Sequence, residues 1–294
     1  MKTLVKLLFI FIPFIFIQCN KESIVNDQVE ILNTPSAMCN LPDLGVQGIN
    51  EGDFHNYLCN LIIDSLQICP EYPTEVSERI VEILIKNKGK ICNDWNFDTA
   101  AYADLLNSVD MSGIIYKTMT YDGYWFDSLD NLGLSPKFKD EILDLYEGLS
   151  NLSIVNYPTI NNFICDFYME NKDSVVSAKD KYLFDIFIDV VNKSAYFWLP
   201  VSDGGLGGEN KWLEMEEILC PNFNELQVRD WPIKLKPFKF MMADATGLLT
   251  SASVSVVATG GLSAVPNPLL GGLPTASVVG LIGGAGASVG TLWN

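Results

Sequence analysis

The C-terminal stretch from Ala245 to Asn294 contains no Asp, Glu, Lys, Arg or His, in a chain whose formal net charge is −17. Small residues recur in it at four-residue spacing, and this pattern begins slightly upstream. The two rows are Ala243, Gly247, Ser251, Ser255 and Thr259, and Ala276, Gly280, Gly284 and Ser288 with Gly286 and Gly290 alongside. Residues four apart share one helix face, and small residues there let two helix backbones approach closely. The pattern predicts closely packed helices.

The two rows are separated by residues that interrupt helices. Gly260-Gly261, Pro266, Pro268, Gly271-Gly272 and Pro274 all lie between them. Proline removes a backbone donor and clashes with the preceding turn, so neither helix can continue through this segment. We therefore predict a Gly-rich apolar helical hairpin over residues 241–294.

The hairpin has two interpretations. Each arm would be about 19 residues, roughly 28 Å long, which is close to one hydrocarbon thickness. The apolar residues of the second arm sum to only about −2 to −4 kcal/mol of insertion free energy. Asp244 in the first arm would further oppose insertion near a bilayer centre. The hairpin either associates with a membrane or with other copies, or it packs on its own protein.

The N-terminus is typical of a secretory signal. Lys2 and Lys6 precede a short apolar run that ends at Gln18-Cys19, too short for an ordinary membrane span. Phe16-Ile17-Gln18-Cys19 resembles the lipobox of bacterial lipoproteins, in the looser form found in Bacteroidota, with Phe16 where Leu is usual and Gln18 where Gly, Ala or Ser is usual. The resemblance implies removal of residues 1–18 and lipidation of Cys19 with palmitate. The alternative is a plain signal peptide with an unrelated cysteine.

The residues after Cys19 bear on location. Lys21-Glu22 partly resembles the surface-export signal of these lipoproteins, although Ser23 interrupts it. That resemblance ends at Glu22 and implies an outer-membrane lipoprotein exposed at the cell surface. Residues 19–50 lack periodicity and contain several Pro and Gly residues, which is typical of a tether that leads away from a lipid anchor.

From Asp53 onward, apolar residues recur at spacings of three and four. The longest such segment runs from Tyr182 to Trp198, with Asp185, Asp189 and Lys193 expected on its solvent side. Ser135-Pro136 is a typical helix start. No long alternating run indicates a sheet. We predict an all-α fold, with an irregular acidic multi-helix domain over residues 51–228, a linker over 229–240 and the C-terminal hairpin.

The linker carries lysines among aromatic residues directly before the hairpin. Trp231, Lys234, Lys236 and Lys239 are the residues concerned. This mixture is typical of an anchor at the membrane–water interface, where ammonium groups and rings lie at headgroup level. The alternative is an extended linker stiffened by Pro232 and Pro237.

Residues for catalysis are scarce. His55 is the only histidine, so a Ser-His-Asp or Cys-His site would have to use it. Its position beside Phe54 near a helix start favours a surface or capping role. The cysteines lack the paired spacing of a zinc site. We expect no enzyme, no metal and no cofactor.

Six cysteines follow Cys19, namely Cys39, Cys59, Cys69, Cys92, Cys165 and Cys220. An even number in an exported protein permits up to three disulfides, whose pairing the sequence leaves open. We expect at least one bridge among the first four. Cys59 and Cys165 lie on apolar helix faces and are expected to be buried free thiols.

The acidic composition excludes nucleic acid as a partner, because phosphates require clusters of Lys and Arg. Attachment to a membrane would come from acyl chains rather than surface charge.

We predict a lipid-anchored, non-enzymatic envelope protein whose hairpin associates with membrane or self-associates. In composition the hairpin resembles that of pore-forming colicins and the Gly-rich helices of two-peptide bacteriocins, which implies a toxin-like role. The alternative is a surface-displayed binding or structural lipoprotein with the hairpin in its core.

Overall fold

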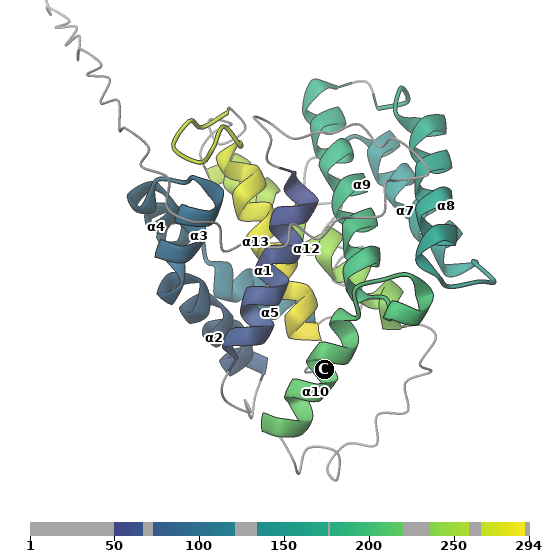
Figure 1. Cartoon of the computed structure of the whole chain (residues 1–294). Helices are drawn as coiled ribbons and strands as arrows, with labels where there is room; N and C mark the ends of the chain where they lie inside the picture. Colours follow the sequence, from purple (N-terminus) through teal and green to yellow (C-terminus); the bar gives the residue numbers. More distant parts are fainter. Residues whose placement is uncertain are drawn as a thin grey trace, which may run out of the picture. The chain divides into compact units, whose positions relative to one another are not determined.

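The computed structural model describes residues 50–66, 73–120, 134–175, 177–219, 236–258 and 266–291. These residues are mostly helical, and within them only two isolated β-bridges occur. The predicted all-α class is confirmed (Figure 1). Cys19, Trp231 and Lys234, and with them the lipidation site and most of the linker, lie outside the described residues.

The described helices run from α1 near residue 50 to α13 at the C-terminal end. In chain order they are α1 (Glu51–Ser65), α2 (Pro73–Lys86), α3 (Lys88–Trp95), α4 (Thr99–Ser108), α5 (Met111–Thr120), α7 (Pro136–Ser150), α8 (Tyr157–Asn171), α9 (Ala178–Trp198), the 3-10 turn η1 (Val201–Asp203), α10 (Gly208–Leu219), α12 (Lys236–Ala258) and α13 (Thr275–Thr291). The predicted start at Ser135-Pro136 is confirmed, because the Ser135 side chain accepts a hydrogen bond from the amide of Phe138.

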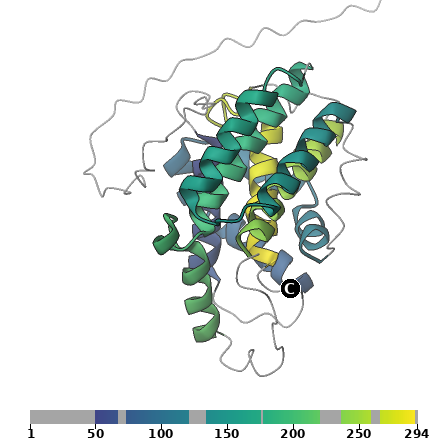
Figure 2. The same ribbon diagram turned by 90° about the vertical axis from the view of Figure 1, so that its right-hand side faces the viewer.

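Helices α12 and α13 belong to the hydrophobic core, together with residues from most of the other described helices. They pack against each other, while α12 also contacts α9 and α13 also contacts α1 and α5. Figures 1 and 2 both show α13, in yellow, among the other helices. Every residue from 276 to 290 is buried, as are residues 240–255 of α12 except Val254, which is 40% exposed. A helix that is apolar on all sides is stable in water only inside other structure.

The core position of these helices means that the break in composition near residue 241 is not a boundary between packed units. Residues 37–294 form one compact unit. Within the described ranges, no helix combines the length and the apolar character needed to cross a membrane.

Glycines allow the backbones of α12 and α13 to come into direct contact. A Cβ atom at Gly284 would lie 2.5 Å from the carbonyl oxygen of Asp244, and one at Gly280 would lie 2.8 Å from that of Leu248. A Cβ at Gly247 would lie 2.7 Å from the carbonyl oxygen of Gly283. Any side chain at these positions would collide with backbone, so the α12–α13 contact requires glycine.

The remaining small residues selected from the sequence are Gly286, Ala276 and Gly290, all on α13. A Cβ at Gly286 would meet the Ile115 side chain of α5 at 2.5 Å. Ala276 and Gly290 are buried near the two ends of the helix. Of the predicted packing positions, the structure therefore places Gly247, Gly280 and Gly284 in the α12–α13 interface, and Gly286 against α5.

The described part of the hairpin turn is docked on the connection between α3 and α4. The amide of Asp98 donates to the carbonyl of Leu269 at 2.6 Å, and Phe97 forms an isolated bridge with Leu270. Gly271 and Gly272 follow with φ of 63° and 87°, a left-handed backbone conformation that favours glycine.

Two expectations need correction. Helix α12 begins at Lys236, so Lys236 and Lys239 belong to a helix and the extended alternative is wrong for that part of the linker. Cys165 is disulfide-bonded rather than free, whereas Cys59 and Cys92 are buried free thiols. A bridge among the first four cysteines would therefore have to join Cys39 and Cys69, which lie outside the described residues.

Candidate functional site

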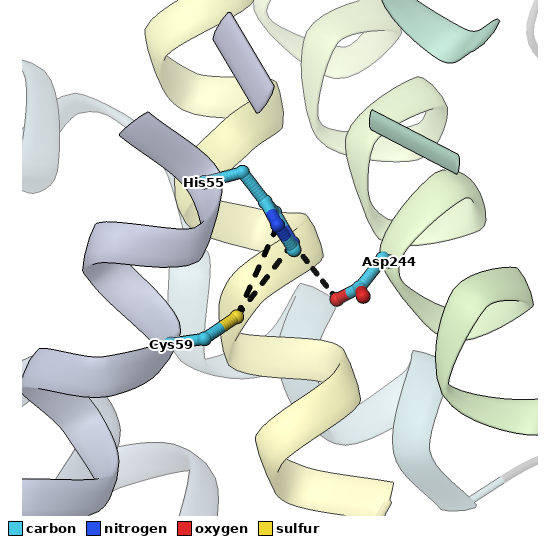
Figure 3. Close-up of side chains that lie close together, drawn as sticks. All are labelled: His55, Cys59 and Asp244. Atoms are coloured by element: carbon cyan, nitrogen blue, oxygen red, sulfur yellow. Dashed lines mark hydrogen bonds and ion pairs between the residues drawn. The ribbon is translucent and has the colours of Figure 1, made fainter. Parts of the chain in front are cut away.

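A polar cluster lies inside the otherwise apolar core, centred on Asp244 of α12. This carboxylate is fully buried. Its Oδ2 accepts hydrogen bonds from the Trp198 indole at 3.0 Å and from the Ser194 hydroxyl, both on one face of α9. Its Oδ1 lies 2.8 Å from Nε2 of His55 on α1 (Figure 3). The cluster thus gives a buried charge the partners that it needs.

His55 is fully buried, so the expected surface or capping role is wrong. The cap of α1 is Asn50, which places His55 in the second turn, on a helix that packs against α9 and α13. Its Nδ1 lies 3.2 Å from the side-chain oxygen of Asn56. The Asn56 amide nitrogen donates to the carbonyl of Lys193 at 2.9 Å, which fixes the orientation of that amide.

Both ring nitrogens of His55 therefore face acceptors, an arrangement that suits a doubly protonated ring. Burial by itself lowers the pKa of His55, but the charge of Asp244 and its hydrogen bond raise that pKa well above the ordinary value of 6.5. His55 and Asp244 consequently form a buried ion pair between α1 and α12. The two residues are 189 positions apart in the sequence.

Cys59 lies one helical turn beyond His55 on the same face of α1. Its Sγ is 3.8 Å from Nε2 and 4.0 Å from Nδ1 of His55, and 3.8 Å from the Ser288 hydroxyl of α13. Burial raises the pKa of this thiol above its ordinary value of 9.0. Cys59 is thus a neutral thiol beside the ion pair, and its predicted burial as a free thiol is confirmed.

A second buried carboxylate lies on α9. Asp189 is only 5% exposed and accepts a hydrogen bond from the amide of Gly52 at 2.8 Å. Its expected position on the solvent side is wrong, because α9 packs against α1 as well as α8 and α12. Burial raises the pKa of Asp189 from 3.8 to about 6. The Lys193 ammonium nearby pairs with Asp53 at 2.8 Å.

A surface hollow of about 360 Å³ lies between α1 and α2, and none of its lining residues belongs to the polar cluster. It is lined by Asp64, Ser65, Arg79, Glu82, Ile83, Lys86 and Asn87. Both signs of charge occur in this lining, so the hollow does not select a ligand of either charge.

No protein-family description, curated protein sequence or solved structure matches this chain. The chemistry of the site therefore rests on its own geometry. His55, Cys59 and Asp244 each offer one donor atom, and these atoms lie within 4.8 Å of one another. All three residues are fully buried, so the cluster is closed to a substrate and suited to holding the fold together.

Sequence reasoning missed this cluster. His55 and Cys59 share one helix, but Asp244 lies 189 positions beyond His55 in the chain, so the three residues form no local motif of known spacing. Three signals were nevertheless present: His55 is the only histidine, Cys59 follows it by one turn, and Asp244 is the last acidic residue of the chain. An acid at the edge of a long uncharged stretch must either reach water or find a buried partner.

Proposed function

We propose that this protein is a non-enzymatic, lipid-anchored protein of the cell envelope, displayed at the outer membrane as a binding or structural module. In this proposal the Gly-rich hairpin is a permanent part of the core of the module and does not associate with a membrane. The observation that carries the proposal is the complete burial of α13 from Ala276 to Gly290.

Three kinds of contact tie the hairpin to the other helices. The carboxylate of Asp244 is bonded to α1 and α9, Gly286 packs on Ile115 of α5, and Leu269 in the turn is bonded to Asp98. Removing a partner from a buried ion pair costs roughly 3–5 kcal/mol. Withdrawal of the hairpin would break all of these contacts, which favours a permanent structural role.

The location and the absence of catalysis rest on separate observations. The disulfide of Cys165 suits an oxidising compartment outside the cytosol. The lipid anchor rests on Cys19 and the residues around it. The enclosed position of His55 and Cys59 supports a non-enzymatic role, because a catalytic pair must reach its substrate.

The second candidate is a hairpin that associates with membrane or with other copies. One observation favours it: the closest backbone approaches of α12 and α13 are with each other, at Gly247, Gly280 and Gly284. The two helices could therefore leave the core as a preformed pair, and small-residue interfaces of this kind also hold helices together in lipid.

A truncated chain that ends at Arg229 separates the two candidates. If the hairpin is the core, the truncated protein should lose cooperative unfolding and become insoluble or molten, as judged by circular dichroism and size-exclusion chromatography. The full-length protein should not float with liposomes once its lipid anchor is removed by Cys19→Ala. A truncated protein that stays folded, together with hairpin-dependent flotation of the full-length variant, would favour the membrane role instead.

A further inference from the structure

Three different metal-ligand types meet in the core. Nε2 of His55 lies 2.8 Å from Oδ1 of Asp244 and 3.8 Å from Sγ of Cys59. In a tetrahedral zinc site, bonds of roughly 2.0 to 2.3 Å hold neighbouring donor atoms about 3.3 to 3.6 Å apart. All three donor atoms lie within 4.8 Å of one another, so changes of up to about 1.2 Å in their separations would bring them to that spacing. His55 and Cys59 lie one turn apart on one face of α1, a spacing suited to binding a single ion.

The charge balance fits a divalent ion. A thiolate from Cys59 and a carboxylate from Asp244 would together neutralise a 2+ ion, while His55 would contribute a neutral imidazole. A site with no net charge is the form that a fully buried position tolerates best. Binding would release the thiol proton of Cys59 and the Nε2 proton of His55 to solvent.

The residues around the three donors are arranged as supports for metal ligands. A histidine that binds a metal usually donates its other ring N–H to a fixed acceptor, and Nδ1 of His55 faces the oriented Asn56 amide at 3.2 Å. Ser194 and Trp198 hold Oδ2 of Asp244, which leaves Oδ1 directed at His55.

We propose that His55, Cys59 and Asp244 bind one zinc-like transition-metal ion that joins α1 to α12. The donor set of sulfur, nitrogen and one carboxylate oxygen suits Zn²⁺ or Co²⁺. It does not suit Ca²⁺ or Mg²⁺, which take oxygen ligands throughout. The fourth position would fall to a water or to the Ser288 hydroxyl, which lies 3.8 Å from Cys59 Sγ. The ion would join the hairpin to α1, the first described helix.

The test uses the full chain without a polyhistidine tag, purified in zinc-containing buffer and dialysed against a weak chelator. Elemental analysis should find about one zinc per chain, and Cys59→Ser or Asp244→Asn should reduce this at least tenfold. The matched control is Cys92→Ala, which removes the second buried free thiol of the described residues and should leave zinc content unchanged. Asn56→Ala should weaken zinc affinity by roughly 10- to 100-fold, as loss of a supporting contact does at other metal sites.

A second measurement uses only the wild-type protein, so it tests the proposal even if the variants fail to fold. Wild-type protein stripped with a strong chelator and refilled with Co²⁺ should show thiolate-to-cobalt charge-transfer absorption, and zinc rebinding should release about two protons per ion. Folded wild-type protein that retains no zinc and gives no such absorption would overturn the proposal and leave the metal-free ion pair as the native state. If Cys59→Ser retained as much zinc as the wild type, the proposal would also be overturned, because the ion would then be bound by other groups such as surface carboxylates.

Discussion

The carboxylate of Asp244 lies 2.8 Å from the imidazole of His55, and both side chains are fully buried. One belongs to the first described helix and the other to the first arm of the hairpin. The only histidine of the chain thus meets the last acidic residue in the core. This contact gives the apolar hairpin one defined position, because any other register of α12 would leave a buried charge without its partner.

The first prediction concerns this ion pair. With a chelator present, so that only the pair is measured, His55→Ala should lower the free energy of unfolding by roughly 3–5 kcal/mol, because Asp244 stays buried without its counter-charge. Urea denaturation monitored by circular dichroism measures the loss. The double variant His55→Leu with Asp244→Leu should recover part of it, since it leaves no buried charge behind. A single-variant loss below about 1 kcal/mol would mean that the pair is solvated like a surface ion pair.

The second prediction concerns the glycines between α12 and α13. Gly284→Ala should destabilise the protein by about 1–3 kcal/mol, because the added methyl group would lie 2.5 Å from a backbone oxygen that cannot move alone. The matched control is Gly89→Ala in α3, where a Cβ meets nothing within 4 Å. That change should stabilise the helix by roughly 0.5–1 kcal/mol. Thermal unfolding of both variants measures the contrast, and equal effects would exclude a specific close contact at Gly284.

The helical elements of this fold could be predicted from the sequence, because they follow from local rules. The spacing of apolar residues predicted helices, Ser135-Pro136 marked the start of α7, and the Gly and Pro residues after Gly260 separated the two hairpin arms. The close approach at Gly247, Gly280 and Gly284 followed from the absence of side chains at those positions.

The polar core could not be predicted, because burial of a residue depends on which helices surround it. Asp189 and Lys193 stand at positions that would face water on an isolated α9, but α1 packs there. His55 carries no sequence mark that distinguishes a surface position from a buried one. Its charged partner, Asp244, comes from a helix remote in the chain, and no rule based on local spacing relates such residues.

The third prediction concerns the lipid anchor, which lies outside the described residues. Metabolic labelling with a palmitate analogue should mark the wild-type protein and not Cys19→Ala, because the lipobox resemblance assigns acylation to that cysteine. Cys92→Ala serves as the matched control and should be labelled like the wild type. Equal labelling of wild type and Cys19→Ala would contradict lipidation at Cys19. The proposed outer-membrane location would then lose its basis.

The last prediction concerns Asp189 and pH. The pKa of this carboxyl is about 6 in the folded protein and 3.8 in its ordinary state. The folded protein therefore holds a proton that the unfolded chain releases between these two values, so Asp189 lowers the unfolding free energy as pH rises from about 4 to 6. At pH 7 its charged form costs up to about 3 kcal/mol of folding stability.

The substitution Asp189→Asn keeps a side-chain oxygen that can accept the hydrogen bond from the Gly52 amide, and it removes the charge. The variant should therefore be more stable than the wild type at pH 7 and equally stable at pH 4.

Urea denaturation at a series of pH values between 4 and 7 measures this difference directly. Asp166→Asn is the matched control, because Asp166 lies exposed on α8 and loses little of its hydration on folding. The free energy of unfolding of the control should decrease with rising pH as it does in the wild type. In Asp189→Asn this decrease should be smaller. If Asp189→Asn lowered stability at pH 7, the contacts of the ionised carboxylate with Gly52 and Lys193 would outweigh the cost of its burial, and the pKa of Asp189 would have to lie below its ordinary value.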